Sequence, residues 1–244
     1  AIRYDDYSDF GGTTNPKISL RWQPSKQLLV RGSWGTGFRA PTLNDLYSPT
    51  LTTNTSGSFD DPARCPTTGS ALDCERQFDA RRGGNIGLQP ETSTQWYAGV
   101  VWEPVDNLSL GVDFFQIKLE DAFTFVSAYT IWESDALFAS QVVRKPNVDP
   151  NFPTLPPPID YVNEYTINAA KQEVQGWDFT LQWRSPAATF GRFGVNFTGT
   201  YLDKWRQSDA LNTEYPNYVG TRGSSGAIPR WRHNVALDWT MGPW

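Results

Sequence analysis

The sequence of 244 residues has little of what catalytic and metal sites need, with one histidine, two cysteines and one methionine. The lone His233 is predicted to lie on the apolar face of a strand, so we expect no Ser-His-Asp catalytic triad. The two cysteines have no nearby histidine and make a poor zinc site. The glycines between Gly32 and Gly37 do not open a helix after a strand, which argues against a phosphate-binding loop. We therefore expect no enzyme, no cofactor and no metal ion.

Long apolar runs are also missing. No stretch reaches the roughly 18 apolar residues of a transmembrane helix, although the alternating strands of a membrane β-barrel never produce such a run. The net charge of -5 argues against nucleic acid as a partner, because nucleic acid calls for a basic face. The start, Ala1 to Asp5, lacks the basic and apolar regions of a signal peptide, so we expect the chain to begin within a structural unit.

Aromatic residues are abundant, at 14% of the chain including 11 tryptophans, and they follow a strand pattern. In the strand predicted to begin at Leu28, alternate positions carry large apolar side chains, while the positions between them are small or charged. Pro41 ends this ladder, since proline cannot donate to it. The same alternation recurs in the segments 17–22, 95–102, 108–115, 177–184, 193–201 and 231–241, after a first short strand at 2–7. The chain is thus predicted to be all-β, with about eight antiparallel strands.

The predicted connections alternate between short turns and long loops, which is typical of an up-and-down barrel with its turns at one edge and its loops at the other. The segment 8–16 reads as turn, and the long irregular segments are 47–88, 121–163 and 206–228. Within the second of them, Trp132 to Arg144 is predicted to form a short helix with Ser134 as its N-cap.

The tryptophans fall in rows on the apolar face of these predicted strands. A row near the short turns contains Trp22, Trp102, Trp183 and Trp239, and a second row toward the loops contains Trp34, Trp96, Tyr201 and Trp231. Two such rows are typical of the aromatic girdles of a membrane barrel. A soluble sandwich or jelly roll would instead bury these faces against a partner layer, and no amphipathic helix long enough to supply one is predicted.

The first long loop holds both cysteines in the run CPTTGSALDC. A close pair among loop residues predicts a Cys65–Cys74 disulfide and an oxidising compartment. The same loop is rich in carboxylates, whose spacing matches no EF-hand, so we expect solvated charges rather than a calcium site. These carboxylates are Asp60, Asp61, Asp73, Glu75 and Asp79.

Three stretches resemble TonB-dependent outer-membrane receptors: GFRAPTLNDLY at 37–47, LQPETS at 88–93 and PRWRHN at 229–234. The resemblance implies that residues 1–244 form a C-terminal part of a barrel of about 22 strands, without its N-terminal plug and first strands. It further implies a Gram-negative outer membrane, lipid and TonB as partners, and uptake of a scarce small molecule such as a siderophore or a carbohydrate. The alternatives are a passive porin-like barrel and a soluble carbohydrate-binding β domain.

The resemblance also assigns roles to side chains. On the parity opposite the tryptophan rows, charged residues are expected to face the plug, because an Arg or Lys in mid-membrane would cost about 2–4 kcal/mol against lipid. These residues are Lys17, Arg21, Arg31, Asp113, Asp178, Arg184 and Asp238. Loop aromatics are candidates for substrate contact, namely Tyr129, Trp132, Tyr215 and Tyr218.

Overall fold

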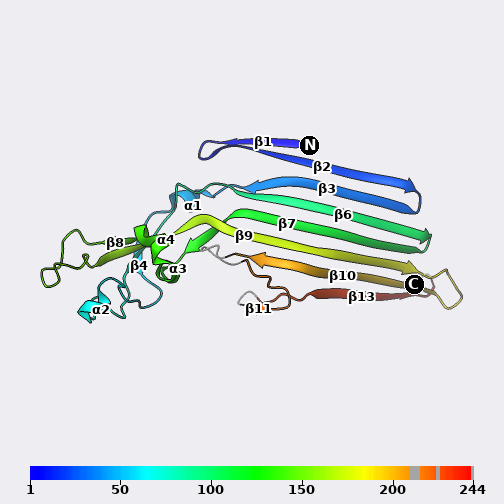
Figure 1. Cartoon of the computed structure of the whole chain (residues 1–244). Coiled ribbons are helices and arrows are strands. Elements are labelled where there is room, and N and C mark those ends of the chain that lie inside the picture. The colour runs from blue at the N-terminus through cyan, green and yellow to red at the C-terminus, as the bar shows by residue number, and fades with distance from the viewer. Residues whose placement is uncertain (209–214, 224–225, 243–244) are drawn as a thin grey trace.

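The computed structural model describes residues 1–208, 215–223 and 226–242. Within these ranges, a meander of eight antiparallel strands forms one curved wall (Figure 1). In spatial order the strands are β1 (Ile2–Tyr7), β2 (Gly11–Ser25), β3 (Leu28–Arg39), β6 (Glu91–Val105), β7 (Leu108–Val126), β9 (Ile159–Arg184), β10 (Arg192–Gln207) and β13 (Trp231–Thr240). The predicted all-β, antiparallel barrel-segment fold is confirmed.

The strand register places both predicted tryptophan rows on one face of the wall. Residues directly opposite in an antiparallel ladder point to the same side, and Leu28 pairs with Trp102, Leu108 with Trp183, and Phe193 with Trp239. Trp34 and Trp96 pair in the second row, with ring centroids 6.1 Å apart. The side chains of Trp22, Trp102 and Trp239 are at least 50% exposed. This apolar face therefore has no protein layer over it within the described chain.

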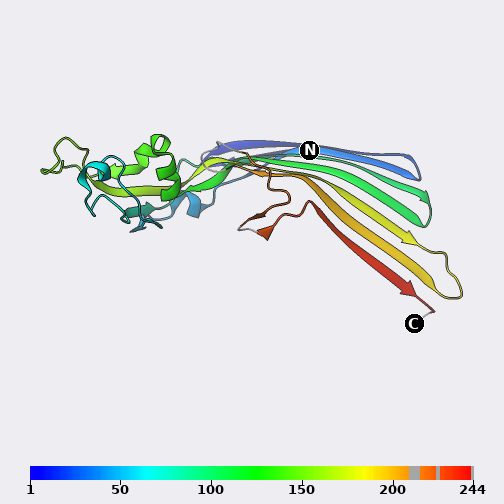
Figure 2. The same ribbon diagram turned by 60° about the horizontal axis from the view of Figure 1, so that its bottom comes forward.

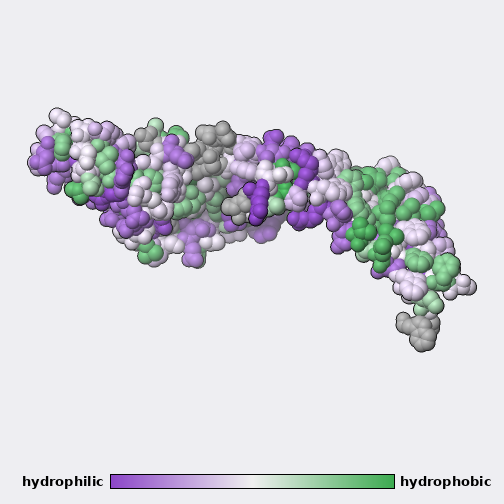
Figure 3. Space-filling view, turned by 90° about the horizontal axis from the view of Figure 1, so that it is seen from below, coloured by the Kyte–Doolittle hydropathy of each residue, from purple (hydrophilic) through white to green (hydrophobic). Residues whose placement is uncertain are grey.

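Figure 3 shows apolar side chains gathered over the end of the wall near the short turns, next to a hydrophilic zone toward the loops. The register explains this boundary. On the face that carries Trp96, Gln116 lies directly opposite Trp96 and Glu173 lies farther toward the loops, and Gln116 donates a hydrogen bond of 2.8 Å to Glu173. On the opposite face, Phe115 and Ile117 follow Asp113. Toward the loops, therefore, the face with the tryptophan rows becomes polar and the opposite face becomes apolar.

Two expectations about connections need correction. The segment 8–16 is not turn throughout, because β2 already begins at Gly11 and pairs with β1 through Pro16. As a result, the β1–β2 connection on the long-loop side is short, and the alternation of short and long connections is not strict. Pro16 is tolerated because its partner, Ile2, is the first residue of the edge strand β1, so the ladder between these two strands starts at this pair.

The long loops fold into a compact unit, which we call the loop body: residues 48–85 and 126–166. Its sheet forms on the first residues of β9, to which β5 (Asp79–Arg82) pairs in parallel and β8 (Val142–Arg144) antiparallel, while β4 (Leu51–Asn54) pairs with β5. The body also contains α2 (Cys65–Thr68), α3 (Ala128–Glu133), α4 (Asp135–Phe138) and the 3₁₀ helix η1 (Ala139–Gln141). Figure 2 shows it projecting beyond the wall.

The loop body has its own hydrophobic core. Phe78, Val126, Ile131, Ile159 and Val162 are at most 5% exposed and cluster together. The predicted helix from Trp132 to Arg144 is wrong: two short helices and a 3₁₀ turn end at Gln141, and Val142 begins a strand. Ser134 also makes no side-chain cap. Pairing with β9 outweighs the weak helical periodicity of this segment.

Smaller elements complete the described chain. The helix α1 (Leu43–Tyr47) follows β3 and begins with a capping box, in which Thr42 and Asp45 bond each other's backbone N–H. In the last loop, β11 (Arg222–Gly223) and β12 (Gly226–Ala227) form a small hairpin. None of the helices that the structure describes is long and apolar enough to cross a membrane.

Candidate functional site

The polar face of the wall, opposite the tryptophan rows, carries a charge network centred on Asp113. Arg31 on β3 reaches across the intervening strand β6 and bonds both carboxylate oxygens of Asp113 on β7, at 3.0 and 2.8 Å. The Tyr97 hydroxyl donates to the same carboxylate. Gly99 makes this possible, because it lies between the two charges and a Cβ there would stand 1.7 Å from Asp113 Oδ1. The network joins three neighbouring strands.

The other predicted polar-face residues lie along the same side. Arg21 pairs with Arg31 in the register, and Asp113 pairs with Asp178, which accepts a hydrogen bond of 2.6 Å from Thr200. Lys17 covers Gly35. At the short-turn end, Arg184 and Asp238 both pair with Gly194. All seven predicted residues thus share one face, and whether they contact a plug stays a prediction.

Toward the loops, the polar face ends in a second ion pair, between Arg39 and Glu91. Nη2 of Arg39 donates to Glu91 Oε1 at 2.7 Å, and Nε donates to the other oxygen. Glu91 Oε1 also accepts the backbone N–H of Phe123 at 2.7 Å, and the Arg39 guanidinium stacks 4.8 Å from the Phe123 ring centroid. The side chain of Glu91 is 4% exposed, whereas that of Arg39 is 62% exposed. One carboxylate therefore joins β3, β6 and β7.

A buried arginine holds the loop body together. Arg64 donates from Nε to Asp73 at 3.0 Å, from Nη1 to the Pro156 carbonyl at 2.9 Å and from Nη2 to Asp149 at 2.7 Å. Its side chain is 2% exposed. The backbone N–H of Asn151, and then Arg64, lower the pKa of Asp149, so this carboxylate stays ionised. Arg64 thus fastens the cysteine loop to the proline-rich segment at 145–158.

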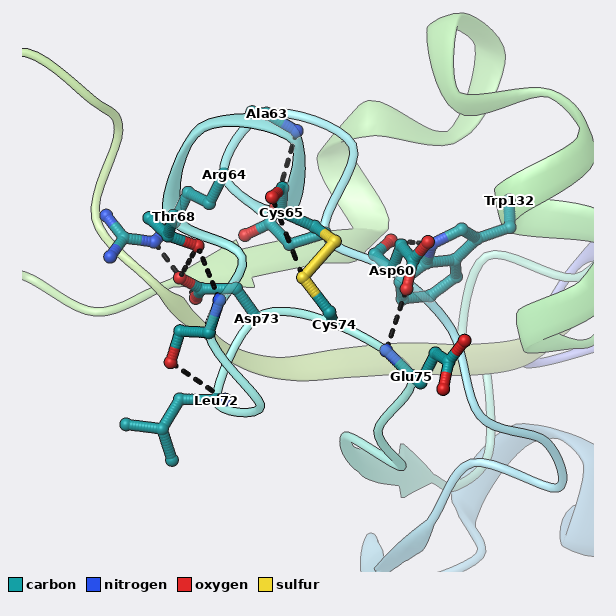
Figure 4. The surroundings of a disulfide bond; sticks show 12 residues. Asp60, Ala63, Arg64, Cys65, Thr68, Leu72, Asp73, Cys74, Glu75 and Trp132 are labelled. Carbon is teal, nitrogen blue, oxygen red and sulfur yellow. Dashed lines mark hydrogen bonds and ion pairs between the residues drawn. A yellow bond between two sulfur atoms is a disulfide. The ribbon is translucent and has the colours of Figure 1, made fainter.

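The predicted disulfide is present. Cys65 and Cys74 are bonded, with Cα atoms 5.1 Å apart. Arg64 and Asp73 directly precede the two cysteines, so an ion pair and a covalent bond lie side by side (Figure 4). The bond closes the loop that presents Arg64 to its partners.

The acidic residues of this loop are not all solvated, which corrects the expectation. Asp61 is buried and accepts two hydrogen bonds from Arg144, at 2.7 and 2.9 Å. Asp73 is buried against Arg64, and Asp60 accepts the backbone N–H of Glu75 at 2.7 Å. Asp60 also lies close to both cysteine sulfurs, but these are consumed by the disulfide. Two arginines, Arg144 and Arg64, neutralise the two buried acids.

The candidate substrate aromatics lie in two different loops. Trp132 stacks between Phe59 and Phe78, at centroid distances of 4.6 and 5.6 Å, and its indole N–H donates to the Asp60 carbonyl. Tyr129 packs edge-on against Phe59 and is 54% exposed. In the last loop, Arg206 lies 5.8 Å from the ring centroid of Tyr215, and burial raises the pKa of the Tyr215 hydroxyl. Tyr218 is 39% exposed. Trp132 has a packing role, and a substrate role for any of the four stays a prediction.

Sequence patterns missed the residues that assemble the loop body. Glu164 is 1% exposed, pairs with Arg82 and accepts the N–H of Ala128 at 2.7 Å. Arg64 and Arg144 play similar roles. The only available signal was the number of arginines within segments otherwise read as loop, and arginines in loops are usually solvated.

The whole chain, residues 1–244, matches the family model described as TonB dependent receptor-like, beta-barrel. A segment of 49 residues is 47% identical to the vitamin B12 transporter BtuB of Vibrio vulnificus (strain YJ016), covering 20% of this chain and 8% of that protein. A match of 49 residues to the vitamin B12 transporter BtuB of Photobacterium profundum has 37% identity, with the same coverage of 20% and 8%. These matches thus span a small part of either relative.

Two solved structures of bacterial receptors have a fold similar to that of this chain. A variant of the ferric enterobactin receptor PfeA of Pseudomonas aeruginosa superposes with a TM-score of 0.63 at 17% identity, over 99% of this chain and 27% of that one. The siderophore receptor PirA of Acinetobacter baumannii gives 0.51 at 15% identity, over 97% and 36%. The chain therefore spans about a third or less of these receptors. Because the family model matches its full length, the chain belongs to the TonB-dependent receptor family, and its sheet is β-barrel wall of the Gram-negative outer membrane.

Proposed function

We propose that this chain is the C-terminal part of the barrel of an outer-membrane transporter that takes up a scarce small molecule with energy supplied through TonB. The observation that carries the proposal is that the two faces of the wall differ in polarity. Its apolar face, with two aromatic rows, suits lipid, while its opposite face holds the Arg31–Asp113 pair and further charges. An active importer needs such a polar interior to hold a removable plug. A passive porin needs it only to line a wet pore.

Energy dependence separates these two functions. The intact receptor, produced in an outer membrane that lacks other receptors, is expected to take up one member of a labelled panel of ferric siderophores, vitamin B12, haem and oligosaccharides. Uptake should stop when a protonophore collapses the proton gradient or when TonB is deleted. Uptake that continues unchanged in both conditions would identify a passive channel. The matched control is the same strain with an empty vector.

We further propose that the polar face contacts the plug. Arg31 is partly satisfied within the wall by Asp113, so Arg21 and Asp178 are the better test positions. Arg21→Glu and Asp178→Lys in the intact receptor should each lower, by about 1 M, the urea concentration at which the plug becomes protease-sensitive, because each reversal replaces attraction by repulsion.

A charge reversal on the opposite face controls for general destabilisation. Lys118 is exposed on the face of β7 that carries Gln116, so Lys118→Glu should leave plug release unchanged. If Arg21→Glu and Asp178→Lys leave both plug retention and uptake as in the parent, these residues line a wet pore and the plug contact is wrong.

A further inference from the structure

A cavity of about 450 Å³ lies on the polar face of the wall, at the loop end of β3, β6 and β7. Arg39, Glu91, Ser93, Leu119, Phe123 and Gln172 line it. Ser93, Leu119 and Gln172 follow one another in a single cross-strand row on the polar face. Gly37 keeps the cavity open beside Ser93, since a Cβ there would stand 2.9 Å from Ser93 Oγ. The volume is within the usual range for small-molecule sites, about 300–1,000 Å³.

The cavity presents one charged edge. Both oxygens of Glu91 are engaged, by Arg39 and by the Phe123 N–H, and its side chain is buried. Arg39 uses Nε and Nη2 for Glu91, stacks on Phe123 and remains 62% exposed. Within the described residues Nη1 of Arg39 donates no hydrogen bond. The group offered to a ligand is thus an oriented guanidinium edge, which suits a carboxylate or another acidic oxygen.

The floor beside this edge is apolar, although the same face carries charged side chains farther along the wall. Leu119 and Ile117 alternate along β7 on the side of Asp113, and Ile117 is 43% exposed. Val174 on β9 pairs with Ile117 and extends the patch. Together with the Phe123 ring, these side chains form a surface against which a flat ring can pack.

We propose that this cavity is a binding site for a small organic anion in which an apolar, ring-like body carries an acidic oxygen. The acidic oxygen pairs with Nη1 of Arg39, and the ring lies over Leu119 and Ile117 next to Phe123. The site deepens the proposed transport function and rests on it, because the cavity lies on the inner face at the loop end of the wall, where an imported molecule first meets the barrel. A plug segment is the competing occupant.

Benzoate is a suitable probe, because it combines a ring with a carboxylate and dissolves well in water. Saturation-transfer NMR on the intact detergent-solubilised receptor should show benzoate binding, with benzyl alcohol at least about threefold weaker because it lacks the charge-assisted contact. Leu119→Ser should weaken both probes by about tenfold through loss of the apolar floor. Arg39→Lys should weaken benzoate alone, since lysine lacks the planar fork.

Lys118→Ser is the matched control, because Lys118 lies between Ile117 and Leu119 but points to the opposite face. It should bind both probes as the parent does. Ile117→Ala, a milder change, keeps the test usable if Leu119→Ser does not fold. Equal benzoate binding in the parent, Leu119→Ser and Ile117→Ala would overturn the site. Benzoate binding seen only after deletion of the plug would also overturn it, by assigning the cavity to the plug. Uptake that proves energy-independent would overturn the transport function while leaving probe binding intact.

Discussion

Replacing Arg64 by methionine in the intact receptor is expected to open the loop body locally. The substitution removes the partner of Asp73, whose side chain is only 4% exposed, and leaves a buried carboxylate uncompensated. Breaking a buried pair in this way costs about 3–5 kcal/mol. Amide hydrogen exchange, followed by mass spectrometry, should therefore be at least about 100-fold faster in the segments around the disulfide and around Asp149. Exchange in the wall strands should be unchanged.

A second arginine of the same loop provides the control. Arg76 is half-buried and lies 4.9 Å from the Phe78 ring centroid, and its two hydrogen bonds go to the backbone carbonyls of Gln77 and Leu72 rather than to a buried acid. Arg76→Met should change exchange by less than about fivefold, as surface substitutions usually do. Equal protection in Arg64→Met and the parent would show that the disulfide and the core hold the loop body without Arg64.

Gly99→Ala is expected to destabilise the wall although it adds only one methyl group. The new Cβ would stand 1.7 Å from Asp113 Oδ1, so the carboxylate must move and loosen its bonds to Arg31 and Tyr97. Overpacking of this kind costs about 1–3 kcal/mol. In the intact receptor, the midpoint of urea unfolding followed by tryptophan fluorescence should fall, and less folded barrel should appear as the heat-modifiable band on gels.

The neighbouring strand offers a matched glycine. A Cβ at Gly32 would meet only the Tyr97 carbonyl oxygen, at an ordinary 3.5 Å, so Gly32→Ala should be tolerated. A Gly99→Ala receptor as stable as Gly32→Ala would mean that Asp113 relaxes without loss. In an Asp113→Ala background, Gly99→Ala should cost less than it does in the parent, because the carboxylate that the new Cβ meets is absent.

The wall could be predicted from the sequence because apolar and polar residues alternate along each of its strands. A strand between lipid and a polar interior must alternate, so Trp22 and Trp239, which are distant in sequence, could be assigned to one face from parity alone. The register confirms that assignment. The disulfide was predictable for a similar reason, since Cys65 and Cys74 are close in sequence and share one loop.

The loop body could not be derived in this way, because its stability depends on contacts between remote residues. Arg64 and Asp149 are 85 residues apart, and Arg144 and Asp61 are 83 apart. No local pattern pairs them, and each alone resembles a solvated charge. The parallel pairing of β5 with β9 likewise joins a four-residue strand, which is too short to show strand periodicity, to the first residues of a remote strand.

The continuity of β9 has a mechanical consequence. Its 26 residues run from the loop body into the wall, with register shifts to β7 opposite residues 168–172, and at about 3.3 Å per residue they amount to roughly 85 Å of extended chain. A load applied along this axis to the outer end is shared by many ladder hydrogen bonds in shear, instead of breaking them one at a time. The loop body is therefore connected to the wall through one strand that pairs with both β7 and β10, and a pull on the loop body would reach the strand segment that carries Asp178.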